Sequence, residues 1–455
     1  MRMLALAGLA AACGSAKPPA PDDAPRAAAK AVAPVEAAAP AEIAARPLGE
    51  ADLTGYDWRK RPGQPAFRMA RAAEARNDWA SVATLCRQAL AADPTNLEAA
   101  WLLAAALGEL GEAPSAIVPP LQVAAAGDFG KWGNASLENP ALAKFRDTPT
   151  GAAWKRRVDE DRATYTAALA RSVVVLARGD LYAFDPSGPR WYRLTRSGTV
   201  LGALAAPSAH QLGYIARVRV KGKPEAALGI IDLAKGTQSR PVPLGDATAQ
   251  IAFSTGEPTG FWVDTRTGWH QLDEDFRWHP VGARPRPAGA WLAVTPTSAR
   301  LHASPGNVTA DWDDQGLASA IRIGSSNRIV AVPSPGLIAR DTAAWSPDRT
   351  RLAFVAQLDD QCTPASSTAA FVADAATGQL TELERATGGL AVEWVADRKL
   401  AIAGDKGVAL ASLDGGAPVP IAGASGLAVP RQRPRCTPLP TEAAPDEEPP
   451  ESGDD

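Results

Sequence analysis

Cysteine and histidine are scarce in this sequence, with four of each among 455 residues. They are scattered, and no CxxC pair, HExxH motif or cluster of His and Asp occurs, so the sequence offers little that could hold a transition metal. The formal net charge is only −3, which favours neither nucleic acid nor an anionic membrane surface as a general partner. We therefore expect no metal, no cofactor and no nucleic-acid partner.

The sequence is rich in apolar residues and in residues that form turns. Hydrophobic residues make up 46% of the chain, and there are 39 glycines and 40 prolines. The length is enough for two or three domains, and the apolar content is enough for a large core. The abundance of glycine and proline predicts many turns together with unstructured segments.

The first residues, MRMLALAGLAAACGS, have the layout of a secretory signal. The apolar run is far shorter than the roughly 20 residues needed to cross a bilayer. Small residues precede Cys13, and in this the stretch resembles a bacterial lipoprotein signal, which implies a signal peptide over 1–12 and lipidation of Cys13. Gly14 and Ser15 then imply an anchor in the outer membrane, facing the periplasm or the cell surface. An ordinary cleaved signal with an incidental cysteine is the alternative.

Two segments have compositions that cannot form a core. Residues 13–62 are dominated by Ala and Pro, and we interpret them as an unstructured tether. Residues 437–455 are acidic and rich in proline, which predicts a disordered tail. Such a tail usually serves solubility, and a role as an acidic docking peptide is the alternative.

Residues 63–170 show helical periodicity with a repeat of 34 residues. The turn residue Asn77 corresponds to Gly111 under this shift, and the first copy closes with ALAADPTN. The period resembles that of tetratricopeptide repeats, which implies helical hairpins and a concave surface that holds a peptide. We expect Pro119 and Pro120 to interrupt the second helix of the second copy. A plain helical bundle without a groove is the alternative interpretation.

The helical period stops at residue 172, and short strands then alternate with turns. The stretch AAWSPDRTRLAFVA at 343–356 contains a corner between two strands, and similar corners recur. Steps of 48, 41, 51 and 49 residues separate these corners, which lie at Pro207, Thr255, Pro296, Pro347 and Ala396. Each step is long enough for a four-stranded unit, the period of a β-propeller.

The two ends of this region complement each other. Residues 172–194 supply three strands without an innermost one, and GLAVP at 426–430 resembles the innermost strand GLAVEW at 389–394. The simplest closure pairs the last strand with the first sheet, which also removes exposed sheet edges. We therefore predict a mainly β protein, a six-bladed β-propeller over 171–436 that follows a small α-helical, tetratricopeptide-like domain.

The repeat WSPDRTRLAFVA closely resembles the repeat of TolB-type propellers, a WD-like β-propeller family of the bacterial envelope. This resemblance covers residues 172–435 as a period. It implies a structural corner in which Asp348 caps the turn after the first strand, and it implies contact with other envelope proteins. It transfers no catalytic residue.

The candidate site residues belong to two sets. In RVRVKGK at 217–223 the alternation places Arg217, Arg219, Lys221 and Lys223 on one face of a strand, either as a solvated face or as a contact for an acidic partner or for the chain's own acidic tail. Cys362 and Cys436 both lie in a CTP motif and are the candidates for a disulfide. The elements that carry them are expected at opposite faces, which leaves the pairing open.

The remaining polar motifs favour structural roles. The loop DWDDQG at 311–316 starts like a calcium loop, but its twelfth position is Arg322, so a plain turn is favoured. The histidines fall in separate repeat elements, at positions 210, 270, 279 and 302, and surface positions are favoured for them. Cys86 lies on an apolar helix position, as an inert core residue would.

These observations predict an exported envelope lipoprotein that acts as a non-enzymatic interaction or assembly module. It would bind envelope proteins through the helical domain or the propeller, and the membrane through Cys13. One alternative is a ligand- or metal-binding propeller enzyme, such as a lactonase-like hydrolase, and another is a structural spacer. The fold alone does not decide between them.

Overall fold

The computed structural model describes residues 43, 48–49, 61–188, 190–205, 211–239, 241–245, 247–254, 260–265, 268–272, 278–280, 308–311, 316–324, 328–358 and 367–429. Residues 1–39 and 40–455 form separate units, and every described residue belongs to the second. The predicted signal peptide and acidic tail lie outside these residues, as do the predicted corners at Pro207, Thr255 and Pro296.

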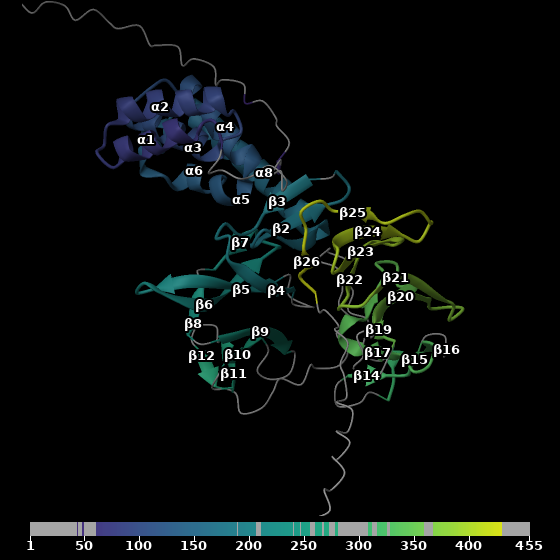
Figure 1. The fold of residues 1–455 in the computed structure, drawn as a ribbon. Helices are drawn as coiled ribbons and strands as arrows, with labels where there is room; N and C mark the ends of the chain where they lie inside the picture. The colour runs from purple at the N-terminus through teal and green to yellow at the C-terminus, as the bar shows by residue number, and fades with distance from the viewer. Residues whose placement is uncertain are drawn as a thin grey trace, which may run out of the picture. The chain divides into compact units, whose positions relative to one another are not determined.

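The described residues from 61 to 171 form helices (Figure 1). Their bounds are α1 Gln64–Glu74, α2 Trp79–Ala92, α3 Leu97–Glu109, α4 Pro114–Gly127, α5 Phe129–Trp132, α6 Ala135–Glu138, the 3₁₀ turn η2 Pro140–Leu142, α7 Ala143–Arg146 and α8 Pro149–Arg171. Side chains cap several starts, because Asp78, Asn96 and Thr148 accept hydrogen bonds from the exposed backbone amides of the first turn. The helical periodicity expected up to residue 170 ends with α8.

The 34-residue shift is visible in the first two helical hairpins. Asn77 joins α1 to α2 with φ of 57°, and Gly111 joins α3 to α4 with φ of 70°. Both turns therefore use the left-handed backbone region, which Gly and Asn enter most readily. The correspondence of these two turns, predicted from the sequence, is confirmed.

The expected interruption at Pro119 and Pro120 was wrong, because both prolines lie inside the continuous helix α4. Each removes one intrahelical hydrogen bond, and the local cost is about 3 kcal/mol or more. Ile117, Val118 and Leu121 are buried in the core around the two prolines. Burial of such side chains recovers roughly 1.5–3 kcal/mol each, so packing outweighs local preference.

Two residues of the segment expected to be unstructured pack against the core. Leu48 is buried in the main core and Ile43 packs against it, although both lie in the segment 13–62 that we interpreted as unstructured. The Gly49 amide donates to Ala126 O, and Gly49 O accepts from the Trp191 amide. Gly49 thus links the end of α4 to Trp191 of a strand that lies 142 residues further along the chain.

Within the described residues, the strands form six antiparallel sheets, which follow one another along the chain except that Leu317–Ala318 of the fifth sheet precedes two strands of the fourth. The first sheet contains β1 Val173–Ala177, β2 Asp180–Asp185 and β3 Arg190–Arg193, and the second contains β4 Val200–Ala205, β5 Gln211–Val220, β6 Lys223–Asp232, β7 Thr237–Gln238 and β8 Val242–Gly245. The third contains β9 Ala247–Ser254, β10 Gly260–Thr265, β11 Gly268–Leu272 and β12 Trp278–Pro280, and the fourth contains β13 Val308–Thr309, β15 Ala320–Ile323 and β16 Arg328–Ala331. The fifth contains β14 Leu317–Ala318, β17 Leu337–Ala339, β18 Ala344–Trp345, β19 Arg351–Gln357, β20 Thr368–Asp374 and β21 Leu380–Ala386, and the sixth contains β22 Ala391–Ala396, β23 Lys399–Gly404, β24 Gly407–Ser412 and β25 Val419–Pro420. The four strands predicted for each of the last two repeats are confirmed.

The last strand returns to the first sheet. β26 (Gly426–Leu427) pairs with β1, with Leu427 opposite Val175, and the order of this sheet is β26-β1-β2-β3. The Ala428 amide donates to Val174 O, and Ala428 O accepts from the Ala205 amide of β4. The predicted pairing between the end of the chain and the sheet begun at 172 is confirmed.

Apolar clusters lie between several pairs of consecutive sheets, and one cluster joins the first sheet to the sixth. The first sheet packs against the sixth through Val173 and Val175. In another cluster, Val355 of the fifth sheet and Trp394 of the sixth pack together. Leu204, Ile215 and Leu228 of the second sheet pack against Phe261 and Val263 of the third. The fourth and fifth sheets share a further cluster. The core of this region is therefore built from sheet-on-sheet contacts.

The innermost strand of the fifth sheet is interrupted, which the sequence did not indicate. β17 and β18 both pair with β19, and one 3₁₀ turn, η4 (Arg340–Thr342), lies between them. The Thr342 hydroxyl donates to Ala339 O and accepts from the Val355 amide at 2.8 Å. This side chain replaces the ladder hydrogen bonds that the turn removes.

Candidate functional site

The helical groove is filled by the chain itself. Helix α3 is buried along nearly its whole length, with Trp101 half-exposed between Ala99 and Gly108. The segment η2 covers it so closely that a Cβ on Gly108 would lie 2.3 Å from Ala141 O. Leu142 of η2 is fully buried in the same core. α3 therefore offers no open groove for a peptide.

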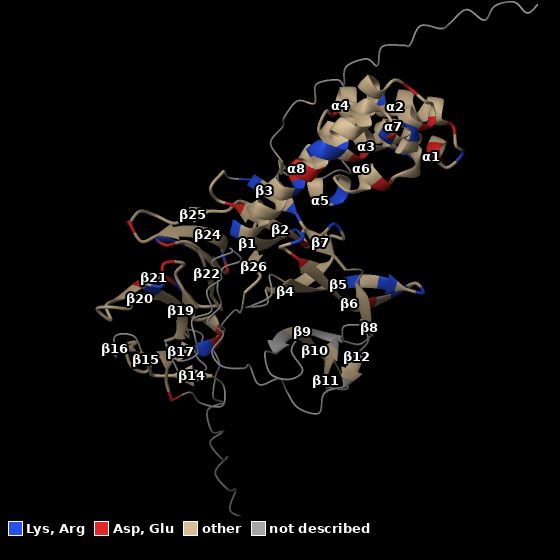
Figure 2. Ribbon diagram, turned by 180° about the vertical axis from the view of Figure 1, so that it is seen from behind, with Lys and Arg blue, Asp and Glu red and all other residues tan. Residues whose placement is uncertain are grey.

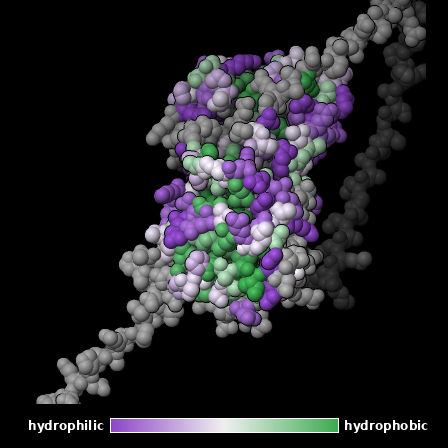
Figure 3. Space-filling model, turned by 90° about the vertical axis from the view of Figure 1, so that its right-hand side faces the viewer, coloured by the Kyte–Doolittle hydropathy of each residue, from purple (hydrophilic) through white to green (hydrophobic). Residues whose placement is uncertain are grey.

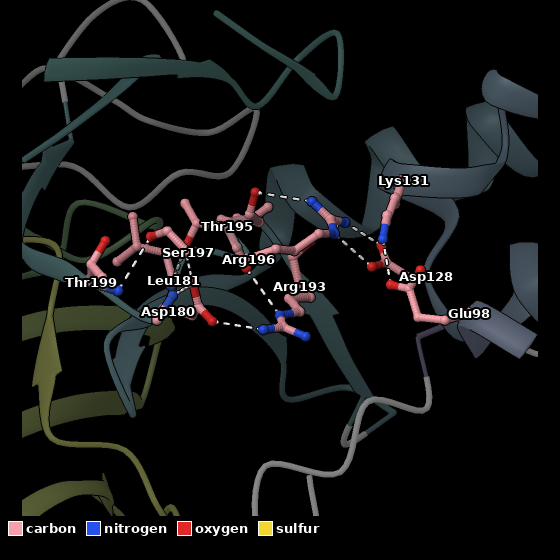
Figure 4. A network of polar contacts seen from close by, with 12 residues as sticks. Glu98, Asp128, Lys131, Asp180, Leu181, Arg193, Thr195, Arg196, Ser197 and Thr199 are labelled. Atoms are coloured by element: carbon pink, nitrogen blue, oxygen red, sulfur yellow. Dashed lines mark hydrogen bonds and ion pairs between the residues drawn. The ribbon is translucent and has the colours of Figure 1, made fainter. Parts of the chain in front are cut away.

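A charged network joins the helices to the sheets (Figure 4). Asp128 caps α5 by accepting from the Lys131 amide, and its Oδ2 also accepts from Arg196 Nε at 2.7 Å. Its neighbour Arg193 donates to Asp180 Oδ2 at 2.7 Å, and Asp180 Oδ1 accepts from the Thr195 hydroxyl. Every member pairs with another, so this network is a structural joint.

Aromatic packing and a second ion pair reinforce this joint. Tyr165 of α8 contacts the rings of Phe129 and Tyr192, at centroid distances of 5.3 and 5.5 Å. Arg171 at the end of α8 pairs with the buried Asp185 of β2 at 2.6 Å. Burial alone would raise the pKa of Asp185, but hydrogen bonds from Arg171 and Ser187 outweigh it and hold this pKa below its ordinary value. The helices are therefore fixed to the first sheet.

The hairpin of β5 and β6 extends beyond the strands beside it (Figure 1). On the β5 side, the hydrogen bonds to the neighbouring segment end where Thr199, just before β4, exchanges hydrogen bonds with Arg217. On the other side, β8 pairs with β6 only as far as Ala226. Beyond these contacts no other described strand pairs with the hairpin, and we call residues 217–226 the basic ribbon.

The basic ribbon carries the four basic residues singled out from the sequence. Arg217, Arg219, Lys221 and Lys223 are all exposed, and the ribbon contains one carboxylate, Glu225. Figure 2 shows basic residues along the outer part of this hairpin. Within the part of the chain that the structure describes, none of the four takes part in an ion pair.

The expectation that all four residues share one face was wrong. The chain reverses at Lys221 and Gly222, which have φ of 49° and 83°, as in the tight turns that match strand twist. Residues directly opposite each other share a face, and Lys223 lies opposite Val220. Arg217 and Arg219 thus share one face, Lys221 lies at the tip, and Lys223 lies on the other face. The ribbon is basic on both sides.

Val218 and Val220, between the basic residues, are half-buried. They lie beyond the end of the neighbouring strands, so only the opposite strand of the ribbon covers them. The ribbon therefore combines charge with accessible apolar surface.

The corner of the fifth repeat has the structural role expected for it. Asp348 Oδ1 accepts from the Ser346 hydroxyl at 2.6 Å and from the Thr350 amide at 3.0 Å. The Asp348 amide in turn donates to Asp397 Oδ1, in the corresponding corner of the sixth sheet. Asp348 therefore holds its own turn and links it to the next repeat.

The other candidates do not assemble into a site among the described residues. Cys86 is fully buried, and burial raises the pKa of its thiol to about 12, so it is inert as expected. His270 and His279 lie on the neighbouring outer strands β11 and β12, and His279 is exposed. Cys13, Cys362, Cys436, His210 and His302 lie outside the described residues.

Two absences hold for the described ranges alone. They contain no group of three or more His, Cys, Asp or Glu that could hold a metal ion. None of the helices in the same ranges has the length and apolar character that a membrane span requires.

A second surface with apolar character lies on the outer strands. Ile329 on β16 and Val419 on β25 are 61% and 64% exposed. Figure 3 shows hydrophobic residues interspersed with hydrophilic ones on the side of the molecule that carries these strands. Single exposed apolar residues are common on soluble proteins, so this surface is a weaker candidate than the basic ribbon.

The residues that the sequence did not reveal are those of the joint. Asp128 and Arg196 are 68 residues apart, and Asp348 and Asp397 are 49 apart. The second pair follows the repeat period and could be sought from it. The first pair follows no pattern in the sequence, because helix docking alone brings it together.

No family model matches the chain, and no curated protein matches it. Similar solved structures include TolB from Acinetobacter baumannii, with 12% identity over 56% of this chain and 65% of that chain and a TM-score of 0.29. The hydrazine synthase of Kuenenia stuttgartiensis matches with 10% identity over 52% of this chain and 71% of that chain and a TM-score of 0.25. An oligogalacturonate lyase in complex with manganese matches with 12% identity over 52% of this chain and 69% of that chain and a TM-score of 0.22. The chain spans slightly less than two thirds of the TolB structure. Because the identities and TM-scores are this low, no activity or partner of these proteins is assigned to this chain. The chain is a mainly β protein with a helical N-terminal part.

Proposed function

We propose that the protein is a non-enzymatic interaction module that binds an acidic envelope protein through its basic ribbon. The observation that carries this proposal is the ribbon itself, an exposed hairpin with four basic side chains that no described carboxylate neutralises. Charge of one sign on a projecting element accelerates encounter with a partner of the opposite sign and selects against wrong partners.

The fold in this proposal is a six-bladed β-propeller preceded by a tetratricopeptide-like helical domain. Six antiparallel sheets, the apolar clusters between neighbouring sheets and the pairing of β26 with β1 support the propeller. The matching left-handed turns at Asn77 and Gly111 support the helical repeat. The filled groove along α3 argues that the helices fix the module rather than bind the partner.

We further propose that the protein is exported and anchored in the outer membrane by a lipid on Cys13. The support is the sequence at 1–15. The test is metabolic labelling with an alkyne fatty acid, followed by membrane fractionation of the wild type and Cys13→Ser. Loss of both the label and the membrane fraction in Cys13→Ser is expected. An unlabelled wild type would leave the ordinary cleaved signal as the explanation.

The interaction is tested with a photo-crosslinking residue at Val220, between the charged residues of the ribbon. In native envelopes we expect one dominant crosslinked partner, lost when Arg217, Arg219, Lys221 and Lys223 are all replaced by Gln. In the matched control variant, four exposed basic residues of the helical domain are replaced by Gln instead: Arg68, Arg76, Arg87 and Lys144. We expect this variant to retain the crosslinked partner. Equal loss in both variants would refute a specific role of the ribbon.

The enzyme alternative has its own outcome in the same preparation. A stoichiometric divalent ion in the purified full-length protein, together with hydrolysis of a lactone, would replace the interaction proposal with a metal-dependent hydrolase.

A further inference from the structure

We propose that the chain's own acidic tail, residues 437–455, occupies the basic ribbon when no partner is bound. This inference rests on the proposed function, because it assigns a competing occupant to the same surface. The tail carries seven acidic residues and no basic one, while the ribbon carries four basic residues against Glu225. The two segments are thus complementary in charge.

The last described residues lie close to the sheet that carries the ribbon. The described chain ends at Val429, next to Ala428, which bonds to Val174 of β1 and to Ala205 of β4. Ala205 lies opposite Leu212 at the start of β5, and β5 continues to the ribbon. Residue 428 therefore lies beside β4, a strand of the sheet that carries the basic ribbon.

The length of chain is sufficient for contact. From Leu212 to Lys221 the strand spans about 30 Å, at roughly 3.3 Å per residue. Adding the two lateral steps, from Ala428 to Ala205 and on to Leu212, at about 5 Å each gives an upper bound of about 40 Å. The 17 residues from Val429 to Asp446 reach about 56 Å when extended. The acidic residues can therefore reach the ribbon tip without disturbing β26.

Attachment to the same chain makes a weak contact effective. Individual exposed ion pairs contribute little and are screened by salt. A short connection, however, raises the effective concentration of the tail at the ribbon to about the millimolar range. An external partner must displace the tail, so the tail sets a threshold for binding.

The test is zero-length carbodiimide coupling, which joins lysine amines to carboxylates that lie in contact. In the full-length protein at low salt we expect crosslinks between Lys221 or Lys223 and the tail, at least about fivefold more than from the exposed control residues Lys144, Lys155 and Lys406. They should disappear in 1 M salt, where the screening length is about 3 Å. A uniform yield over all five lysines, or crosslinks that persist in high salt, would overturn the proposal.

Mixing ¹⁵N-labelled and unlabelled protein separates the tail from a second copy. Crosslinked peptides of a single isotope are expected, and mixed pairs would overturn the proposal in favour of contact between copies. A variant truncated after Cys436 should crosslink its partner severalfold more at Val220. If the truncation has no effect but the four-Gln variant still loses the partner, the tail inference fails while the proposed function stands.

Discussion

At the residue scale, buried carboxylates decide how the helices are attached. Asp128 and Asp185 are both nearly inaccessible, and each is paired with an arginine that comes from the other side of the joint. A buried charge is costly when its partner is removed, whereas exposed pairs contribute little. Arg196 pairs with a buried carboxylate and Arg398 pairs with an exposed one, so these two arginines provide a matched comparison.

We expect Arg196→Ala to lower the free energy of unfolding by about 2–3 kcal/mol, because the Asp128 side chain is only 8% exposed and loses its main partner. Arg398→Ala should cost at most about 1 kcal/mol, because Arg398 and Asp414 are 47% and 61% exposed. Urea unfolding followed by circular dichroism measures both. If both variants lose the same free energy of unfolding, the burial of Asp128 does not make its ion pair with Arg196 more important than an exposed pair.

The lowered pKa of Asp185 predicts an acid dependence of the joint. Because the folded pKa lies below the ordinary value of 3.8, the ionised carboxylate stabilises the fold above that pH. This contribution is lost as the pH falls through the folded pKa. We expect Asp185→Asn to be less stable than the wild type at pH 7, with a difference that narrows toward pH 3. A difference that stays constant over this range would contradict the assignment.

At the element scale, consecutive sheets are joined by specific contacts as well as by apolar area. Trp394 of β22 is fully buried, and its indole Nε1 donates to Ala344 O of β18 at 2.8 Å. Trp345 lies 49 residues earlier, in the corresponding strand, and is also buried. Its Nε1 has no hydrogen-bond acceptor among the described residues. The repeat thus places two tryptophans in similar surroundings with different polar partners.

Trp394→Phe should therefore destabilise the protein by about 0.5–1.5 kcal/mol more than Trp345→Phe, since only the first removes a hydrogen bond. The loss of ring volume is the same in both variants, so each controls for the other. Thermal and urea unfolding give the comparison. A larger effect of Trp345→Phe would show that packing, not the hydrogen bond, controls this contact.

At the scale of the whole molecule, the last described residues close the first sheet. Ser425 donates its amide to Leu176 O, β26 pairs with β1, and Ala428 bridges β1 and β4. Without these residues, the edge of β1 would lose its partner and become a template for association with other chains.

Truncation after Ser425 should lower the unfolding midpoint by roughly 5–10 °C and produce concentration-dependent association. Truncation after Cys436 retains β26 and should leave the midpoint nearly unchanged. Differential scanning calorimetry and sedimentation velocity separate the two effects. An unchanged midpoint in the shorter variant would mean that closure by β26 contributes nothing to stability.

Local patterns in the sequence determined the elements of this protein. The 34-residue period placed the turns at Asn77 and Gly111, the corner at Pro347 located the strands of the fifth and sixth sheets, and the likeness of 426–430 to 389–394 revealed the closing strand. These features depend on spacing and turn chemistry, which act between near neighbours or repeat at fixed intervals. The continuous helix through Pro119 and Pro120 was missed because distant packing outweighed a local rule.

Only the tertiary structure decided which surfaces are available. The sequence indicated a basic stretch at 217–223 but not the turn that puts Lys223 on the opposite face, nor the end of the neighbouring strands that leaves the ribbon free. It indicated helical repeats but not that η2 fills the groove along α3, or that Arg196 meets Asp128. Exposure and pairing depend on contacts between segments far apart in the chain, and no pattern within one segment carries that information.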